Sequence, residues 1–188
     1  VDMDDVAISA RNMRSGRVAP IFTVSNRTGE GLYLLRRFLN LLPPRLKWEA
    51  EASKPFLAYI DDKFNVPGVG LVAAGLVLQG SASVNSHVRI GPFRDGTFRL
   101  TRVKSIHAKR GLYIEKAQTG RSVTFALADI SFDEVEKGMA LIGEGLPVEP
   151  VRAFEAEVFI LHHPTTIRTG YEAIFHIHSI KEACRIAW

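Results

Sequence analysis

The chain has 188 residues, of which 46% are hydrophobic and 23% charged; this composition is that of a globular protein and excludes wholesale disorder. No apolar run reaches the roughly 20 residues of a membrane-spanning helix, and the acidic start of the sequence is unlike the basic start of a signal peptide. A single cysteine, Cys184, excludes an internal disulfide and a cysteine-based zinc site, which favours a reducing compartment, and we expect a cytoplasmic protein.

The first predicted elements are two short strands and a helix. Residues 6–11 and 18–24 are rich in β-prone side chains and predict the strands. Thr28 is the expected helix N-cap, and apolar side chains over 31–42 recur at helical spacing until a double proline ends the pattern. This order indicates the last βα unit of an α/β domain, here a C-terminal remnant at residues 1–46. The apolar face of the 31–42 helix could form a homodimer contact or rest on the barrel.

The middle of the chain, residues 47–148, has the pattern of an all-β domain. Short β-prone runs alternate with Gly, Pro, Asp and Asn at the spacing of a small closed barrel or sandwich. The expected strands are residues 56–60, 70–78, 87–90, 98–107 and 122–127. Isolated glycines in this region mark bulges or points of close backbone approach.

Positive charge is concentrated in this middle region. Residues 89–121 carry nine basic and two acidic side chains, so this segment has a charge of +7 within a chain of net charge +4. Clustered Lys and Arg are the footprint that phosphate backbones select, because counterion release favours them. The alternative is a solvated strand face, and charge alone does not separate the two.

The last section, residues 149–188, is predicted to be the start of a second β-barrel. Extended runs at 154–162 and 173–178 predict two strands. The section is much shorter than the roughly 100 residues of a typical domain. We therefore expect a mainly β fragment that contains one whole barrel, a preceding βα remnant and an incomplete second barrel.

Several motifs stand in the order found in the translational GTPases. Lys-Pro-Phe at 54–56, an acidic pair and Gly-Val-Gly at 68–70 resemble the opening of the second domain of elongation factor Tu, and residues 136–141 resemble its closing turn. The stretches 103–110 and 161–167 are similar to the GTP-binding protein 1 and 2 family of eukaryotes. The resemblance covers nearly the whole chain and implies a barrel of the translation-factor domain II type.

The resemblance also implies a nucleotide-binding role for one loop. Ser25 and Asn26 resemble the family's loop that presents a backbone N–H group to guanine. The phosphate-binding motif Gly-x-x-x-x-Gly-Lys-Ser/Thr is absent from the sequence, as are Asp-x-x-Gly and Asn-Lys-x-Asp. We therefore expect this fragment to carry no cofactor and neither to bind nor to hydrolyse GTP, whereas the full-length parent would use GTP and magnesium.

The resemblance implies an RNA contact on the barrel, with tRNA or the ribosome as partner. Elongation factor Tu holds the 3′ end of aminoacyl-tRNA on a Gly-x-Gly hairpin and on a strand and loop with basic residues. The corresponding candidates are Val66, Gly68, Gly70, Lys104, Ser105, His107, Lys109 and Arg110. Glycines allow close approach of a nucleotide, while histidine and cations offer stacking and charge. Ser105 stands where the family has a glutamate, so recognition of an aminoacylated end does not follow.

Three other functions compete with RNA binding. The barrel could be a protein–protein interaction module without an RNA-end pocket. His176 and His178 lie two apart on a predicted strand, and His162 and His163 are adjacent, which suits metal chelation. Without cysteine or carboxylate partners, packing or surface roles explain these histidines better, and no metal is predicted. No nucleophile elbow of the Gly-x-Ser-x-Gly type occurs, so no catalytic residue is predicted.

Overall fold

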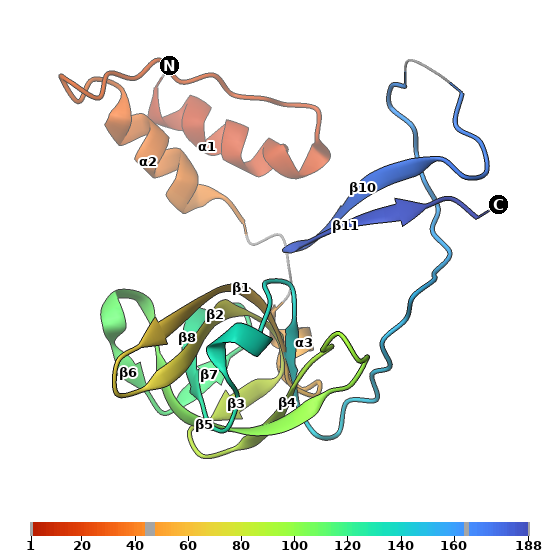
Figure 1. The fold of residues 1–188 in the computed structure, drawn as a ribbon. Coiled ribbons are helices and arrows are strands. Elements are labelled where there is room, and N and C mark those ends of the chain that lie inside the picture. Colours follow the sequence, from red (N-terminus) through yellow and green to blue (C-terminus); the bar gives the residue numbers. More distant parts are fainter. Residues whose placement is uncertain (1, 44–47, 164–165, 188) are drawn as a thin grey trace. The chain divides into compact units, whose positions relative to one another are not determined.

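The computed structural model describes residues 2–43, 48–163 and 166–187. The chain forms two compact units, Val1–Lys47 and Trp48–Trp188. The first unit contains α1 (Met3–Asn12), the short 3-10 helix η1 (Met13–Ser15) and α2 (Leu32–Leu41) (Figure 1). None of the helices in the described residues is long and apolar enough to cross a membrane.

Residues 6–11 lie in helix α1, so the strand predicted there is wrong. Asp2 caps this helix, because its carboxylate accepts hydrogen bonds from the backbone N–H groups of Asp4 and Asp5, while Asp5 accepts one from the N–H of Asp2. The bond from the Asp5 N–H group is the main reason that the pKa of Asp2 lies below its usual value. Val6 and Ala10, one turn apart, are both buried. The capping box therefore stabilises a helix here, although the side-chain propensities favour a strand.

Residues 18–24 are extended but form no strand within the described part of the chain, so the second predicted strand is also wrong. An extended segment becomes a strand only where a neighbouring backbone accepts and donates its hydrogen bonds. Phe22 instead packs on Phe38 of α2, with ring centroids 5.1 Å apart. Ile21 next to it is 89% exposed. The predicted βα unit is thus observed as an extended segment followed by a helix.

Helix α2 confirms the prediction over 31–42 to within one residue at each end. Gly31, not Thr28, is its N-cap, with a left-handed φ of 71°. A Cβ atom at this position would lie 2.1 Å from the carbonyl oxygen of Thr23, so only glycine fits. The Thr28 hydroxyl instead accepts a hydrogen bond from the N–H of Glu30 in the preceding turn.

Part of the apolar face of α2 is used within its own unit. Phe38 is buried in a small cluster with Val6 and Ala10 of α1. Leu39 is 57% exposed. The homodimer contact through this helix remains a prediction. Pro44, the second proline of the predicted helix stop, lies outside the described residues.

The second unit is built on a closed barrel of six antiparallel strands. It begins with α3 (Trp48–Ala52), and its strands are β1 (Leu57–Val66), β2 (Gly70–Gln79), β3 (Ser81–Ser83), β4 (His87–Gly91), β5 (Arg99–His107), β6 (Tyr113–Ile114), β7 (Lys116–Gln118), β8 (Ser122–Leu127) and β9 (Ala140–Ile142). The short 3-10 helices η2 (Lys109–Gly111) and η3 (Phe132–Glu134) lie between them. The pairings run β1, β2, β8, β5, β4, β9 and back to β1, which closes the ring (Figure 1). Strand β6 adds to β5 outside the ring, and β3 pairs with β7.

The predicted barrel is confirmed. The five expected strands correspond to β1, β2, β4, β5 and β8, whereas β3, β6, β7 and β9 were missed because two or three residues show no periodicity. Strand β2 alternates buried and partly exposed residues, as a strand with one face on a core does. The largest fully buried side chains of the barrel come from every side of the ring: Ile60, Leu71, Ile90, Ile106, Phe125, Leu127 and Leu141.

The last section contains a two-stranded hairpin, β10 (Glu172–Ile177) and β11 (Ile180–Arg185). The strand predicted at 173–178 is confirmed as β10, except that His178 lies in the turn with a left-handed φ of 53°. The strand predicted at 154–162 is wrong, because this segment pairs with no strand of the described chain and leaves Phe159 and Leu161 about nine-tenths exposed. Assignment of residues 149–188 to a second barrel stays a prediction.

Candidate nucleic-acid interface

Strand β5 carries the predicted basic residues to the outer surface of the barrel. Val103 and Ile106 point into the core and are fully buried, whereas Arg102 and Lys104 are exposed. Two residues rather than one lie between these inward side chains, because a bulge between Val103 and Ser105 shifts the register with β8. The bulge turns both Lys104 and Ser105 away from the core.

The chain leaves β5 through a tight turn that exposes two cations. Arg110 and Gly111 both have left-handed backbones, with φ of 66° and 74°. The N–H of Ala108 donates to the carbonyl of Leu112 at 2.7 Å, and the N–H of Gly111 donates to the carbonyl of Ala108 at 3.1 Å, which closes the turn. Lys109 and Arg110 at its tip are exposed and form no ion pair with any described residue.

A hollow of about 400 Å³ lies beside this turn. It is lined by residues 107–111, 122–124 and 74–75, together with Asp61. The strand register explains its floor, because Ala74 on β2 is paired with Thr124 on β8, which is paired with His107 on β5. Small side chains on β2 leave room above the sheet, and the turn with Lys109 and Arg110 forms the rim.

The glycine-rich turn between β1 and β2 forms a second group of candidate residues. Gly68 and Gly70 have φ of 77° and 90°, and no atom lies within 4 Å of a Cβ built on either. The N–H of Val69 donates to the carbonyl of Val66 at 3.0 Å. The Lys104 ammonium donates to the carbonyl of Val69 and so ties this turn to β5. The positive φ values give these glycines a structural role in the hairpin, and their surface is open.

The predicted residues thus share one outer face but form two groups. The first is Val66, Gly68 and Gly70 with Lys104, and the second is His107, Lys109 and Arg110 around the hollow. From Gly70 to Ala74, β2 advances about 14 Å, and the two groups lie about this far apart along the strand. Ser105 lies between them, in one row across the sheet with Ala126 and Val72.

Sequence analysis missed two exposed aromatic residues on this face. Phe64 is 46% exposed and is paired with Val72, which places it in the row that ends at Ser105. Tyr113 is 52% exposed and is paired with His107 on β5. A strand assignment extended from residue 60 to 66 would have placed Phe64 on the outer face, but no periodicity marks the two-residue strand of Tyr113.

Some of the nine basic residues of 89–121 bind other groups of the chain, and the rest are open to a partner. Arg94 pairs with Glu136 at 2.8 Å, and Arg99 pairs with Glu134 at 2.6 Å. A guanidinium nitrogen of Arg89 donates to the carbonyl of Leu146 at 2.6 Å. The Lys104 ammonium likewise donates to the carbonyl of Val69. Within the described chain, the remaining five form no ion pair: Arg102, Lys109, Arg110, Lys116 and Arg121. Most of the predicted charge is therefore available to an anionic partner.

The predicted guanine loop is a compact turn in the first unit. The Ser25 N–H donates to the carbonyl of Glu30 at 3.0 Å, and the Ser25 hydroxyl accepts the N–H of Thr28 at 3.2 Å. The N–H of Asn26 donates to no group in the described residues. The loop fits the presentation of a backbone N–H group to a base, but it offers nothing to phosphates.

The histidines of the last section do not converge. His176 lies in β10, whereas His178 is in the following turn and stacks on Tyr59, with ring centroids 4.5 Å apart. The His163 ring nitrogen Nε2 lies 3.0 Å from the Tyr171 hydroxyl. Among the described residues, no group of three or more His, Cys, Asp or Glu side chains could hold a metal ion.

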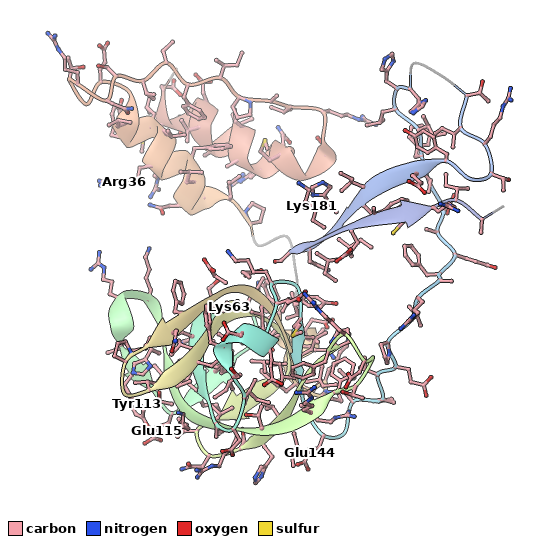
Figure 2. All side chains as sticks on the ribbon, in the orientation of Figure 1. Arg36, Lys63, Tyr113, Glu115, Glu144 and Lys181 are labelled. Atoms are coloured by element: carbon pink, nitrogen blue, oxygen red, sulfur yellow. The ribbon has the colours of Figure 1, made fainter. Side chains whose placement is uncertain are left out.

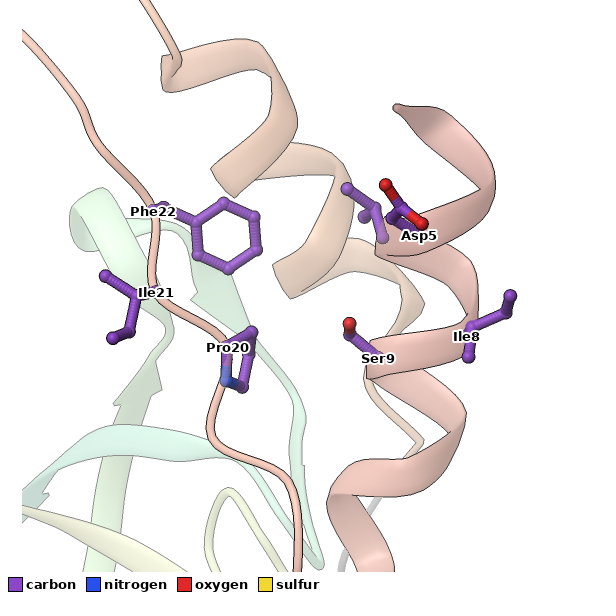
Figure 3. A pocket seen from close by; sticks show the side chains of 7 residues that line it. Asp5, Ile8, Ser9, Pro20, Ile21 and Phe22 are labelled. Carbon is purple, nitrogen blue, oxygen red and sulfur yellow. The ribbon is translucent and has the colours of Figure 1, made fainter. Parts of the chain in front are cut away.

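A second hollow, of about 310 Å³, lies in the first unit between α1 and residues 20–22 (Figure 3). Ile8, Ile21 and Phe22 line it together with Ser9, and Asp5 is the only charged lining residue in the described part of the chain. It therefore does not suit an anion.

Comparison with known proteins connects the chain to a family. The chain is 42% identical over 183 residues to GTP-binding protein 1 of Xenopus laevis, a match that covers 97% of this chain and 28% of that protein. It is 33% identical over 183 residues to GTP-binding protein 2 of Homo sapiens, with 95% and 30% covered. It is 29% identical over 165 residues to elongation factor 1-alpha of Methanopyrus kandleri, with 83% and 37% covered.

The chain is related to the translational GTPases of the elongation factor Tu type. The relationship expected from the motifs is thereby confirmed. A crystal structure of a bacterial selenocysteine-specific elongation factor has the same fold, with a TM-score of 0.58 at 21% identity over 77% of this chain and 25% of that chain. No protein-family model matches the sequence. The chain spans only 28–37% of the length of the curated relatives described above.

Proposed function

We propose that this chain is the barrel-containing part of a GTP-dependent translation factor, and that the outer face of its barrel binds the unpaired 3′ end of an RNA such as tRNA. The observation that carries this proposal is the pair of exposed cations, Lys109 and Arg110, at the rim of the hollow beside His107. Neither has an acidic partner among the described residues. The hollow has a histidine wall, a cationic rim and one lining carboxylate, Asp61; its two cations outnumber this acid, which suits a base and its phosphate.

The row of residues beside the hollow supports a single-stranded ligand. Phe64 offers an exposed ring in the row that ends at Ser105, and Val72 lies partly exposed beside it. Unpaired bases stack on exposed aromatic rings, whereas a paired base has its faces covered by its neighbours. Because Ser105 is neutral, the proposal covers the RNA end and not the amino acid that an RNA end can carry.

The proposal is tested by measuring the affinity of the 188-residue chain for an RNA hairpin with a short unpaired 3′ extension, over a series of salt concentrations. The reversal Lys109→Glu with Arg110→Glu should weaken binding at low salt. It should also reduce the slope of log affinity against log salt by about 1.4, about 0.7 for each lost contact to a single strand.

A matched control is Arg36→Glu with Arg37→Glu. These two residues are also adjacent, exposed and cationic, but they lie on α2 in the other unit. The control should leave the slope unchanged. No binding by the wild-type chain at low salt, or equal effects of the two reversals, would show that the barrel does not bind RNA through this rim.

Docking on the ribosome through the same face is the second candidate, and the exposed side chain of Leu112, at 66%, favours it. Free RNA with an unpaired 3′ end should compete with ribosomal particles for the chain if the proposed site is shared. Ribosome binding that such RNA does not displace would favour an interaction module instead.

The complete protein is proposed to bind GTP and magnesium, with Ser25 and Asn26 next to the guanine. The N–H of Asn26, which donates to no group in the described part of the chain, supports this role. GTP would bias how the barrel is presented to its partner, as in other nucleotide-dependent switches. Exchange of Asn26 for proline removes this N–H and should weaken GTP binding by a protein of the relatives' length.

A further inference from the structure

Tyr113, next to the hollow, extends the candidate site from β5 onto β6. Tyr113 on β6 is paired with His107 on β5, and the two ring centroids lie 5.9 Å apart at an interplanar angle of 73°. His107 lines the hollow, whereas Tyr113 continues the same row beyond it, at the edge of the barrel that carries β6 (Figure 2). About half of the Tyr113 side chain is exposed, and its hydroxyl bonds to no described residue.

The spacing of the two rings selects for an unpaired strand. Stacked bases in a duplex strand follow one another at about 3.4 Å. Two bases that each contact one of these rings, 5.9 Å apart and steeply inclined, cannot also stack on each other. The strand must be splayed, which a single-stranded end permits and a duplex does not.

Charge indicates on which side the phosphates would run. Lys109 and Arg110 stand at the turn between β5 and β6, so they lie within the same hairpin as both rings. Glu115 comes two residues after Tyr113, in the chain direction away from this turn, and would repel a phosphate there. A cationic turn beside two aromatic rings is the combination that single-strand binders use.

We propose that Tyr113 is a base-stacking residue, so that the site holds two neighbouring unpaired nucleotides, one in the hollow against His107 and the next on Tyr113. The inference rests on the proposed RNA binding. It adds the number of nucleotides that the site holds and the stacking contact that Tyr113 makes. Because every base has a stacking face, the Tyr113 contact should tolerate any base.

The test is a double-mutant cycle between protein and RNA. The probe is an RNA hairpin with an unpaired 3′ extension, in which an abasic nucleotide replaces each unpaired position in turn. Tyr113→Ala should weaken binding of the intact RNA about tenfold. At one position, the abasic RNA should bind the wild-type chain as weakly as the intact RNA binds the variant, and the two losses should not add.

Three variants control for structure and chemistry. Tyr113→Phe should bind as the wild type does, since it keeps the ring. Tyr113→Leu should lose affinity like Tyr113→Ala while it keeps an apolar side chain on β6. Tyr33→Ala removes another exposed tyrosine, 62% exposed on α2 in the other unit, and should change nothing. Unchanged thermal unfolding of the Tyr113 variants would confirm that their barrel is intact.

The outcomes separate this inference from the proposed function. Full affinity of Tyr113→Leu, together with a loss on reversal of Lys109 and Arg110, would overturn the stacking role and leave RNA binding in place. Strict additivity at every abasic position would overturn it as well. A loss of ribosome binding by Tyr113→Leu without any loss of RNA affinity would identify a protein contact instead. If the wild-type chain binds no RNA, both proposals are wrong.

Discussion

Gly75 on β2 lies directly against the carbonyl oxygen of Tyr59 on β1, and a Cβ atom built on Gly75 would be 1.9 Å from that oxygen. The close approach arises where β1 bulges at Asp61, between the pairs Ile60 with Gly75 and Asp62 with Ala74. The same glycine contributes to the floor of the hollow. The bulge therefore affects both the shape of the hollow and the pairing of β1 with β2 that closes the barrel.

Gly75→Ala should destabilise the barrel by about 2–3 kcal/mol, because the added methyl group must push two paired strands apart. Urea unfolding measures this as a lower midpoint. Gly145→Ala is the control, since nothing lies within 4 Å of a Cβ there and its backbone is not left-handed. Equal midpoints for the two variants would contradict the observed contact.

Phe38→Ala should loosen the first unit by about 3–5 kcal/mol, because it empties the centre of the cluster with Val6, Ala10 and Phe22. Amide hydrogen exchange should become faster in α1 and α2 while the barrel strands keep their protection. Leu39→Ala, on an exposed position of the same helix, should have little effect. Equal exchange in both variants would show that α1 and α2 do not depend on this cluster.

Acid should weaken the barrel partly through Glu134. The hydrogen bond from Arg99 holds the pKa of this carboxyl below its usual 4.5, with the Ser131 N–H as a second cause. Because the folded-state pKa is the lower one, the stabilisation is present above about pH 4.5 and is lost as the pH falls through the folded-state pKa. Glu134→Gln should therefore lower the urea midpoint at neutral pH and reduce its fall towards acid.

Glu144→Gln is the matched control for this titration, because Glu144 is exposed and forms no ion pair with the described residues. It should leave the acid dependence of the midpoint as in the wild type. The assignment to Glu134 would be wrong if both glutamine variants followed the wild-type pH profile.

The 188-residue chain should show no measurable affinity for a labelled GTP analogue. None of its residues form the Gly-x-x-x-x-Gly-Lys-Ser/Thr loop whose N–H groups and lysine hold the phosphates. Fluorescence polarisation with and without magnesium measures this, and a protein of the relatives' full length serves as the positive control. A micromolar dissociation constant for the short chain would contradict the prediction.

The barrel could be predicted from the sequence because its strands carry their own signal. In β2, alternation places Leu71, Ala73 and Val77 in the core whatever the neighbouring strand is. Motif order along the chain likewise predicted the relationship to translational GTPases. Both depend only on the order of residues, which any fold must preserve.

Elements that depend on hydrogen bonds to distant parts of the chain could not be predicted in this way. Residues 6–11 and 18–24 have strand-like side chains, but a capping box made the first a helix and no neighbouring strand pairs with the second in the described chain. The segment 154–162 likewise forms no strand, because no strand of the described chain pairs with it. A strand is a relation between two backbones, and local composition supplies only one of them.

The sequence by itself determined the closed barrel, the surplus of positive charge in 89–121 and the family relationship, because periodicity, charge and motif order are properties of the chain alone. Only the tertiary structure decided which charges are neutralised by ion pairs, and that Lys104 joins the glycine-rich turn while His107, Lys109 and Arg110 surround a hollow. It also brought Tyr113 beside His107. Strand register and bulges, which set these neighbours, arise from packing across the whole barrel and leave no local pattern in the sequence.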